Sequence, residues 1–267
     1  MKKSILLVLF VAFGATAFAQ DEPDAKRDKK NERKEARRER INALMKQSEE
    51  GVLVFSKQSV FGIQFRTNGY GAFYEIGRTK TNRKTNIYRL DITEIKSPKE
   101  EKLPSGGFFV GNPYIYGKVN YFYQATLGFG QQYVLGQKGN KNGVAVTAIY
   151  NAGISIGMLR PYYVEVIDGS ATKMIKYSSQ DSADFLGPQI FGGGGFGKGW
   201  GEMKIKPGAF AKTALRFDYG RFNEVVSGIE VGISVEAYSE KIPILLFQKD
   251  KQIFYQGYIS LLFGRRK

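Results

Sequence analysis

The stretch Gly228–Ala237, with the sequence GIEVGISVEA, decides the fold class of this chain. Every second position in it is apolar: Ile229, Val231, Ile233, Val235 and Ala237. Glycine, glutamate or serine fills the positions between them. Because successive side chains of a strand point to opposite faces, an extended backbone here has one apolar and one polar face. This unbroken alternation predicts a β-strand.

The same alternation recurs at residues 119–130, 144–157 and 211–219. These stretches are longer than the roughly 5–6 residues usual for strands of soluble sheets. They supply the roughly 9–11 residues that a membrane-spanning strand needs. The polar face is rich in glycine and charged residues, and the apolar face carries aromatic residues near strand ends, as in the interfacial girdles of outer-membrane barrels. These girdle candidates are Tyr121, Tyr123, Tyr162, Phe217 and Tyr219.

The pattern therefore predicts an all-β fold, a closed antiparallel transmembrane β-barrel over residues 51–267, with a soluble β-sandwich as the less favoured alternative. Ten strands are expected, at residues 59–67, 70–79, 86–95, 119–133, 143–157, 162–167, 172–178, 208–219, 225–238 and 252–263. Eight strands are possible if residues 162–178 are a loop excursion. Asn68-Gly69 and Asp168-Gly169 are hairpin turn signals.

The first 19 residues have the three parts of a secretory signal peptide. Lys2 and Lys3 are the positive region, Ile5–Phe13 is the apolar region, and Ala17-Phe18-Ala19 is a small-residue cleavage site. Export of a barrel predicts the cell outer membrane. An even strand number places both termini in the periplasm and the long connections 96–118 and 178–206 on the extracellular side.

Residues 20–50 differ in composition from the rest and predict a short, charged, periplasmic helical arm. Residues 21–50 contain ten Lys or Arg and nine Asp or Glu. One reading is a docking arm for lipid headgroups or a partner, and the other is a solvated linker. The candidate docking residues are Arg33, Lys34, Arg37, Arg38, Arg40, Ile41 and Leu44. The partners expected are outer-membrane lipids and other outer-membrane or periplasmic protein subunits.

Charged residues of both signs fall on the inward face of the predicted strands. They are Arg66, Glu75, Arg89, Asp91, Lys212, Arg216, Asp218, Glu230 and Glu236. Because buried charges must be paired, we expect them to form a network across the lumen and to fill it. The alternative is a selective pore or a proton path.

The composition excludes most catalytic chemistry. The chain has no Cys and no His. This rules out disulfides, thiol nucleophiles, the Ser-His-Asp arrangement and nearly all zinc sites. We therefore expect no enzyme activity, no catalytic residue and no cofactor. The net charge of +15 would suit a nucleic-acid partner, but export argues against one and favours lipid phosphates or acidic proteins.

Two motifs remain as weak candidates. Gly192–Gly197 followed by Lys198 has phosphate-loop spacing, but Gly199 stands where Ser or Thr would hold Mg²⁺, so we expect a loop and no nucleotide. Asp181 and Asp184 could bind Ca²⁺, but too few ligands are evident. We expect instead that this segment caps a short helix.

Several segments carry a resemblance to known proteins. They are Tyr116-Gly117-Lys118, Leu135-Gly136-Gln137, Pro161-Tyr162-Tyr163, Gly199-Trp200-Gly201-Glu202 and Leu215–Arg221. The strand Phe254–Phe263 also resembles the C-terminal signal read by the outer-membrane assembly machinery, although the basic tail after it departs from that pattern. Over residues 50 to 267 the chain resembles small outer-membrane β-barrels of the OmpX, OmpA membrane-domain and PorT type. More narrowly, it resembles an uncharacterised barrel family.

The resemblance implies fold and location but no biochemical activity. Relatives of the PorT kind take part in secretion, which is an analogy of fold only. We expect a structural or accessory subunit of a larger outer-membrane complex, of the assembly or secretion type. The alternative is a small solute channel or a surface ligand-binding barrel.

Overall fold

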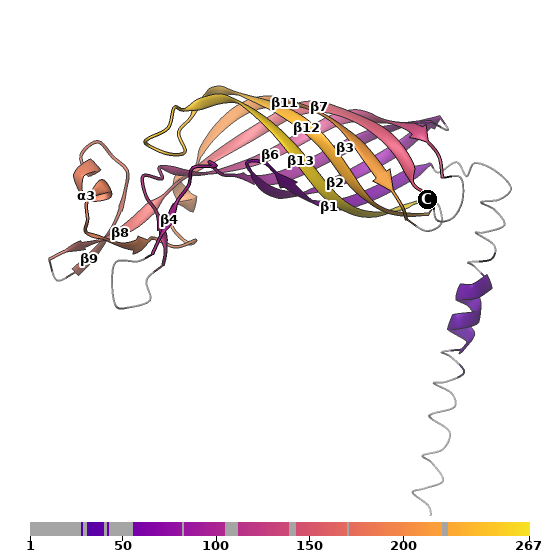
Figure 1. The fold of residues 1–267 in the computed structure, drawn as a ribbon, viewed down its shortest axis with the longest axis horizontal. Helices are drawn as coiled ribbons and strands as arrows, with labels where there is room; N and C mark the ends of the chain where they lie inside the picture. The colour runs from indigo at the N-terminus through magenta and orange to yellow at the C-terminus, as the bar shows by residue number, and fades with distance from the viewer. Residues whose placement is uncertain are drawn as a thin grey trace, which may run out of the picture. The chain divides into compact units, whose positions relative to one another are not determined.

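The computed structural model describes residues 28, 31–39, 42, 56–81, 83–104, 112–138, 143–169, 171–220 and 224–267. The chain divides into two units, Met1–Leu53 and Val54–Lys267, which are described separately. The predicted signal peptide, residues 1–19, lies outside the described residues. In the first unit, residues 31–39 are helical and exposed, so the short N-terminal helix is present (Figure 1). No helix among the described residues is long and apolar enough to cross a membrane.

The second unit is built around a closed barrel of eight antiparallel strands in the order β1-β13-β12-β11-β7-β6-β3-β2 (Figure 1). The strands are β1 (Lys57–Arg66), β2 (Gly69–Thr81), β3 (Lys84–Ile95), β6 (Asn120–Gly136), β7 (Ala145–Pro161), β11 (Lys204–Asp218), β12 (Val225–Ile242) and β13 (Lys251–Arg266). β1 pairs with β13 over nine residue pairs, which closes the ring. Closure leaves no free sheet edge, so the backbone groups are satisfied within the barrel.

The all-β transmembrane barrel is therefore confirmed, but the preferred count of ten strands is wrong. The alternative of eight is correct, because residues 162–178 leave the barrel. Here β8 (Tyr163–Asp168) pairs with β9 (Ala171–Lys176) on one side and with β10 (Ile190–Gly193) on the other, in a separate three-stranded sheet. The barrel strand beside β7 is β11. Periodicity identifies a strand correctly but does not say which sheet the strand joins.

The two hairpin signals are at turns, as predicted. Thr67 and Asn68 connect β1 to β2, and the β8–β9 hairpin turns at Gly169 with a φ of 64°. A positive φ at this position suits glycine, which has no Cβ to clash with the backbone.

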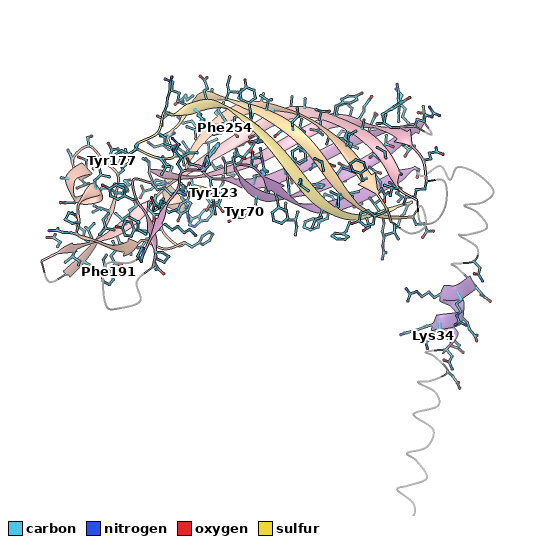
Figure 2. All side chains as sticks on the ribbon, viewed as in Figure 1. Lys34, Tyr70, Tyr123, Tyr177, Phe191 and Phe254 are labelled. Carbon is cyan, nitrogen blue, oxygen red and sulfur yellow. The ribbon has the colours of Figure 1, made fainter. Side chains whose placement is uncertain are left out.

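The barrel wall is apolar outside and polar inside. In β12, Ile233 on the outer face is 61% exposed, whereas Glu230 on the inner face is fully buried. The same alternation runs along all eight strands. A soluble barrel would bury its apolar face, so this pattern matches a barrel whose outer wall faces lipid. Figure 2 shows side chains on this outer wall, including Tyr70 near the rim.

The connections separate into two kinds at the two barrel ends. One end holds the short connections β2–β3, β6–β7 and β11–β12, together with the start of β1 and the C-terminus. The opposite end holds the long connections 96–119 and 162–203 and the loop 243–250. We call the described residues of these three connections the cap. In Figure 1 the cap elements α3, β8 and β9 lie at the end opposite the C-terminus.

The cap is folded and packs onto the barrel mouth. Besides β8–β10 it contains β4 (Lys102–Leu103), β5 (Tyr114–Ile115), the helix α3 (Ser182–Leu186) and the 3₁₀ turn η1 (Trp200–Glu202). One apolar cluster joins cap and mouth: Ile95, Ile115, Phe122, Leu159, Tyr162, Val164, Val166, Ile175, Phe185, Ile190, Tyr238, Ile242, Ile244, Leu245 and Phe254. The long connections are therefore a structured layer over the lumen.

Two buried polar groups tie the cap segments together. The Ile115 amide donates to the Tyr162 hydroxyl at 2.9 Å, and burial raises the pKa of Tyr162 to about 12. Lys118 Nζ lies 2.8 Å from a Glu100 carboxylate oxygen, and burial lowers the pKa of Lys118. Tyr162 was expected in an interfacial girdle, which is wrong. It is 3% exposed because the chain turns inward after β7 and carries its ring into the cap core.

The lipid-facing wall predicts a position-dependent cost for charge. Replacing Ile233, at the middle of β12, with Arg places a cation at mid-depth and lowers the free energy of unfolding by about 2–4 kcal/mol. The matched control is Val225→Arg at the end of the same strand, with an expected cost of about 0–1 kcal/mol. Urea unfolding in phospholipid vesicles, followed by circular dichroism, measures both. Equal costs would contradict a wall that faces lipid.

Candidate functional site

The centre of the lumen is closed by four charged side chains from opposite walls. Arg216 of β11 donates from its two Nη atoms to the two carboxylate oxygens of Glu75 on β2, each at 2.8 Å. Arg89 of β3 donates to Glu230 of β12 at 2.7 Å, and Arg216 also donates to Glu230 at 2.7 and 3.0 Å. All four side chains are at most 1% exposed.

The Arg216–Glu75 and Arg89–Glu230 contacts cross the full width of the barrel. In the ring of eight strands, β2 and β11 are diametrically opposite, and so are β3 and β12. Bidentate arginine–carboxylate ion pairs, such as Arg216–Glu75, are strong and geometrically specific. Side chains that meet across the full diameter leave no straight path through this layer.

A second layer of the network surrounds Asp91. Its carboxylate accepts from Lys212 at 2.7 and 2.9 Å, from Arg89 Nε at 3.1 Å and from the Thr126 hydroxyl at 3.2 Å. With this layer included, three cations face three anions in the middle of the lumen. The balance of charge offsets the large cost of removing each ion from water.

The remaining predicted lumen residues lie towards the two mouths. Near the cap, Arg66 forms an ion pair with Glu236 and donates to Gln124 at 3.1 Å. Near the opposite mouth, Asp218 accepts from Arg266 at 2.7 Å and from the backbone amide of Gly220 at 2.9 Å. The structure thus places all nine sequence-predicted residues in one polar interior that runs the length of the barrel.

Neutral polar groups and rings fill the space between the ions. The Arg89 guanidinium lies 3.5 Å from the ring centre of Phe73, and the Tyr258 hydroxyl donates to Glu230 at 3.1 Å. The buried neutral polar residues include Gln58, Gln64, Thr93, Gln124, Thr126, Gln132, Thr147, Asn151, Ser155, Ser234, Gln256 and Ser260. Narrow barrels of this strand number are typically filled by side chains.

Sequence reasoning missed a cationic residue at the junction of barrel and cap. Arg160, 1% exposed, lies 4.2 Å from the ring centre of Tyr121, 4.7 Å from Trp200 and 5.0 Å from Phe196, and donates to the Phe196 carbonyl at 2.6 Å. Trp200 also stacks on Tyr123, with ring centres 5.6 Å apart. Cation–π contacts of this kind stabilise by about 2 kcal/mol when desolvated. The sequence hint was the run of aromatic residues within a glycine-rich segment.

These contacts correct the expected girdle further. Tyr121 and Tyr123 are half-buried beneath the glycine-rich segment, and Figure 2 shows Tyr123 close to the cap. Phe217 and Tyr219, by contrast, are exposed on the outer wall near the opposite end. An aromatic residue near a strand end can therefore either face lipid or pack beneath a loop. Alternation in the sequence does not distinguish these two positions.

The two weak motifs take other roles in the structure. Gly199 has a φ of 85°, and an added Cβ would lie 2.7 Å from the Pro161 carbonyl oxygen. Glycine is therefore needed here because the two backbone segments pass close to each other. Only a three-residue 3₁₀ turn follows it. Asp181 stands at the N-cap position of α3, but its carboxylate accepts from the Ser178 hydroxyl and makes no cap hydrogen bond, so the predicted cap is wrong in that detail. In the described part of the chain, no group of three or more His, Cys, Asp or Glu could hold a metal ion.

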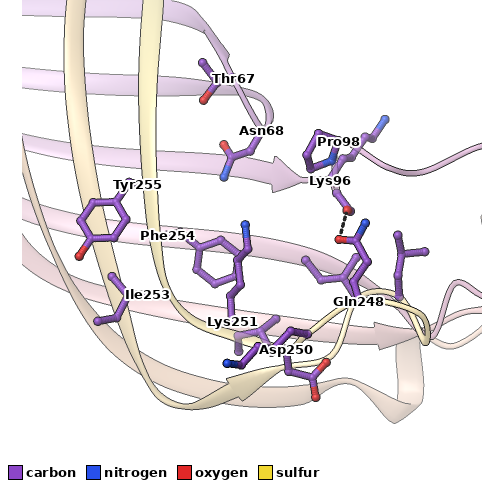
Figure 3. Close-up of a pocket in the computed structure, with 15 residues that line it drawn as sticks. Thr67, Asn68, Lys96, Pro98, Gln248, Asp250, Lys251, Ile253, Phe254 and Tyr255 are labelled. Atoms are coloured by element: carbon purple, nitrogen blue, oxygen red, sulfur yellow. Dashed lines mark hydrogen bonds between the residues drawn. The ribbon is translucent and has the colours of Figure 1, made fainter.

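A cavity of about 550 Å³ opens at the cap-side rim (Figure 3). We call it the rim cavity. It lies between the β1–β2 turn, the segment after β3, and the β12–β13 connection with the start of β13. Its lining residues are Thr67, Asn68, Lys96, Ser97, Pro98, Ile242, Ile244, Leu245, Gln248, Lys249, Asp250, Lys251, Ile253, Phe254 and Tyr255. Its volume is within the range of roughly 300–1,000 Å³ that small-molecule sites occupy.

A band of exposed cations lies on the outer wall at the opposite end. We call it the basic crescent; it consists of Lys57, Arg78, Lys80, Lys84 and Arg265. These residues belong to β13, β1, β2 and β3, which are consecutive in the barrel. Lys57 stands directly opposite Arg78. No carboxylate in the described ranges forms an ion pair with any member of the crescent.

The candidate docking residues of the arm are only partly described. Arg33, Lys34, Arg37 and Arg38 are helical and exposed, and Figure 2 shows Lys34 on this helix. Arg40, Ile41 and Leu44 lie outside the described residues.

Comparison with known proteins yields similar folds only. The chain matches no protein-family model and no curated protein. Among solved structures it is similar to Ail, the attachment invasion locus protein of Yersinia pestis, with 11% identity, 80% of this chain and 100% of that chain covered, and a TM-score of 0.37. It is also similar to Neisserial surface protein A, with 9% identity, 79% of this chain and 96% of that chain covered, and a TM-score of 0.39. A third similar structure is the N-terminal β-barrel domain of Pseudomonas aeruginosa OprF, with 8% identity, 79% of this chain and 98% of that chain covered, and a TM-score of 0.33.

These solved structures are small outer-membrane β-barrels, the class that the sequence resemblance predicts. At such low identities and TM-scores, the barrel assignment rests on the strand pairing of this chain itself. The narrower resemblance to an uncharacterised barrel family stays a prediction.

The lumen network predicts that neutralising one of its ions lowers the stability of the barrel strongly. Glu230→Gln leaves two buried guanidiniums without a full set of anions, so the free energy of unfolding falls by about 3–5 kcal/mol. The control is Glu94→Gln, whose partner Lys96 is partly exposed, with an expected cost of about 0–1 kcal/mol. Urea unfolding in vesicles measures both variants. If Glu230→Gln costs no more than the control, the network does not stabilise the barrel.

Proposed function

We propose that this chain is an integral outer-membrane β-barrel that does not conduct and that works through its two ends. The observation that carries this proposal is the salt-bridge layer that joins diametrically opposite strands across the lumen. Transport through the barrel would require this layer to separate. A barrel sealed by its own side chains leaves the cap and the turn end as the surfaces available to other molecules.

The proposed orientation places the cap outside the cell and both chain termini in the periplasm. Its support is the division of connections, since outer-membrane barrels have short periplasmic turns and long extracellular loops. The signal-like residues 1–19 provide the export step that this location requires. The helical arm at residues 20–50 is then periplasmic.

Between the roles open to such a barrel, we favour surface ligand binding at the cap. The long connections pack around a shared apolar core and border the rim cavity, so the cap has the order that a binding surface needs. The role is non-enzymatic. The charged groups of the lumen are engaged with one another, and the chain has no His and no Cys to supply the usual catalytic groups.

A second candidate is an accessory subunit of a larger outer-membrane complex, of the assembly or secretion type. The observation in its favour is the exposed helix of the arm, which carries Arg33, Lys34, Arg37 and Arg38. A mild-detergent pull-down from native outer membranes tests this role. A stoichiometric partner that is lost on deletion of residues 21–50 supports it, and a barrel recovered alone with the arm intact contradicts it.

The sealed lumen predicts electrical silence. In planar bilayers the wild-type barrel is expected to show no steady single-channel steps. The double variant Arg89→Ala/Arg216→Ala removes both cross-lumen guanidiniums and leaves Glu75 and Glu230, so cation-selective steps are expected. Arg265→Gln on the outer wall is the control and stays silent. Steady steps from the wild-type barrel would overturn the proposal.

The basic crescent predicts a preference for anionic phospholipid. Like charges directly opposite on a sheet destabilise it, and the Lys57–Arg78 pair therefore favours an anion between its members. Each such cation near an anionic membrane surface contributes about 1 kcal/mol. We expect the barrel to retain phosphatidylglycerol over phosphatidylcholine in native mass spectrometry, and Lys57→Gln/Arg78→Gln/Lys84→Gln to reduce that preference. The control is Lys198→Gln/Lys204→Gln/Lys241→Gln at the cap end, and an equal loss there would contradict the assignment.

A further inference from the structure

The rim cavity exists because neighbouring strands differ in height at the cap end. β1 ends at Arg66 and turns through Thr67 and Asn68. β13 begins earlier in its own direction, at Lys251, and pairs with β1 only from Tyr258 onward. The upper part of β13 therefore rises beyond β1 and leaves a notch in the barrel rim.

The opposite side of the same strand is also irregular. The pairing of β12 with β13 is continuous up to Ala237 and then shifts to Ile242 opposite Lys251. The loop that follows β12 folds over the notch and supplies the back wall of the cavity, as Figure 3 shows around Gln248 and Asp250. The loop closes the cavity at the back, and the cavity opens where the outer wall of the barrel meets the cap.

The cavity has one apolar wall. Ile242, Ile244, Leu245 and Phe254 are buried in the core shared by cap and barrel, and Ile253 beside them is 46% exposed. A wall made only of aliphatic and aromatic groups favours a hydrocarbon chain, because burying methylene groups is favourable.

The rim of the cavity is cationic. Lys96, Lys249 and Lys251 line it, against the single carboxylate Asp250. Of these lysines, Lys96 lies 3.6 Å from Glu94, and no ion pair within the described ranges involves the other two. Figure 3 shows Lys96 and Lys251 on different sides of the opening. The excess of positive charge favours an anion at the rim.

Two buried polar atoms of the lining have no hydrogen-bond partner in the described part of the chain: Gln248 Nε2 and Asn68 Oδ1. The Gln248 amide is held in place because its oxygen accepts from the Ser97 hydroxyl at 2.9 Å. Its Nε2 group is therefore an oriented donor that a bound anion would satisfy. An unsatisfied buried donor is costly, and a ligand oxygen that accepts from it would recover this cost.

We propose that the rim cavity binds a single-chain anionic amphiphile of the fatty-acid class. The acyl chain lies along Ile242, Leu245 and Phe254, and the carboxylate accepts from Gln248 Nε2 and faces Lys249 and Lys251. This inference rests on the proposed function, because it names the ligand class of the surface-binding cap. The single apolar wall fits one chain, and the Gln248 donor and the lysines fit an anion.

The test is photocrosslinking in a membrane. The full barrel is reconstituted in phosphatidylcholine nanodiscs and illuminated with a diazirine analogue of palmitate, and labelled peptides are mapped by mass spectrometry. We expect labelling in residues 242–255 that unlabelled palmitate competes away. The methyl ester of palmitate and hexadecyltrimethylammonium, which lack the anion, are expected to compete about tenfold less well.

Matched variants locate the site. Lys249→Gln/Lys251→Gln removes the cationic rim and is expected to weaken labelling about tenfold, and Thr67→Trp fills the opening from the β1–β2 turn and is expected to abolish it. The control Lys198→Gln/Lys204→Gln removes the same charge elsewhere at the cap end and leaves labelling unchanged. Circular dichroism confirms that each variant keeps its β-structure.

Three outcomes would overturn the proposal. Labelling spread along the outer wall of all strands would mean contact with the bilayer only. Equal competition by the methyl ester would remove the anionic requirement, and equal competition by phosphatidylglycerol would replace the single chain with a membrane phospholipid. The proposed function is tested separately: a silent barrel whose cap is protease-accessible from outside the cell keeps it even when crosslinking fails, whereas a conducting barrel removes it whatever is labelled.

Discussion

The arginine–carboxylate layer at the centre of the lumen is the interaction on which the rest of the structure depends. Glu75, Arg89, Arg216 and Glu230 come from four strands and meet on the barrel axis. Each ion alone would be too costly to bury, so all four must be present together. Their contacts fix the distance between opposite walls of the eight-stranded ring. The same side chains fill the lumen at this level.

Lipid as solvent explains why this polar interior is compatible with stability. A soluble domain gains stability by burying its apolar side chains, but here those side chains face outward and the polar ones pack inside. Backbone hydrogen bonding closes around the ring, so no strand edge is exposed to hydrocarbon. We propose that the filled barrel is a support whose surfaces for other molecules lie where the strands end.

The two ends of that support differ in kind. The turn end presents the basic crescent on four consecutive strands, with Lys57 opposite Arg78 and no ion pair to a carboxylate among the described residues. The cap end presents a folded layer anchored by Arg160 and its aromatic neighbours, beside a cavity with an apolar wall and a cationic rim. We propose that the turn end faces lipid phosphates and that the cap end binds a ligand that combines a chain with a charge.

Alternation along the chain was enough to predict the fold class, the transmembrane wall and which charged residues face inward, because a strand exposes its two faces with a strict period of two. It was not enough to count barrel strands. β8 alternates as the barrel strands do, and only its pairing with β9 and β10 shows that this hairpin belongs to the cap. The exact ion pairs, the position of Arg160 and the rim cavity arise between residues far apart in sequence. They depend on strand register and on the unequal heights of β1 and β13, which are properties of the closed ring and not of any one segment.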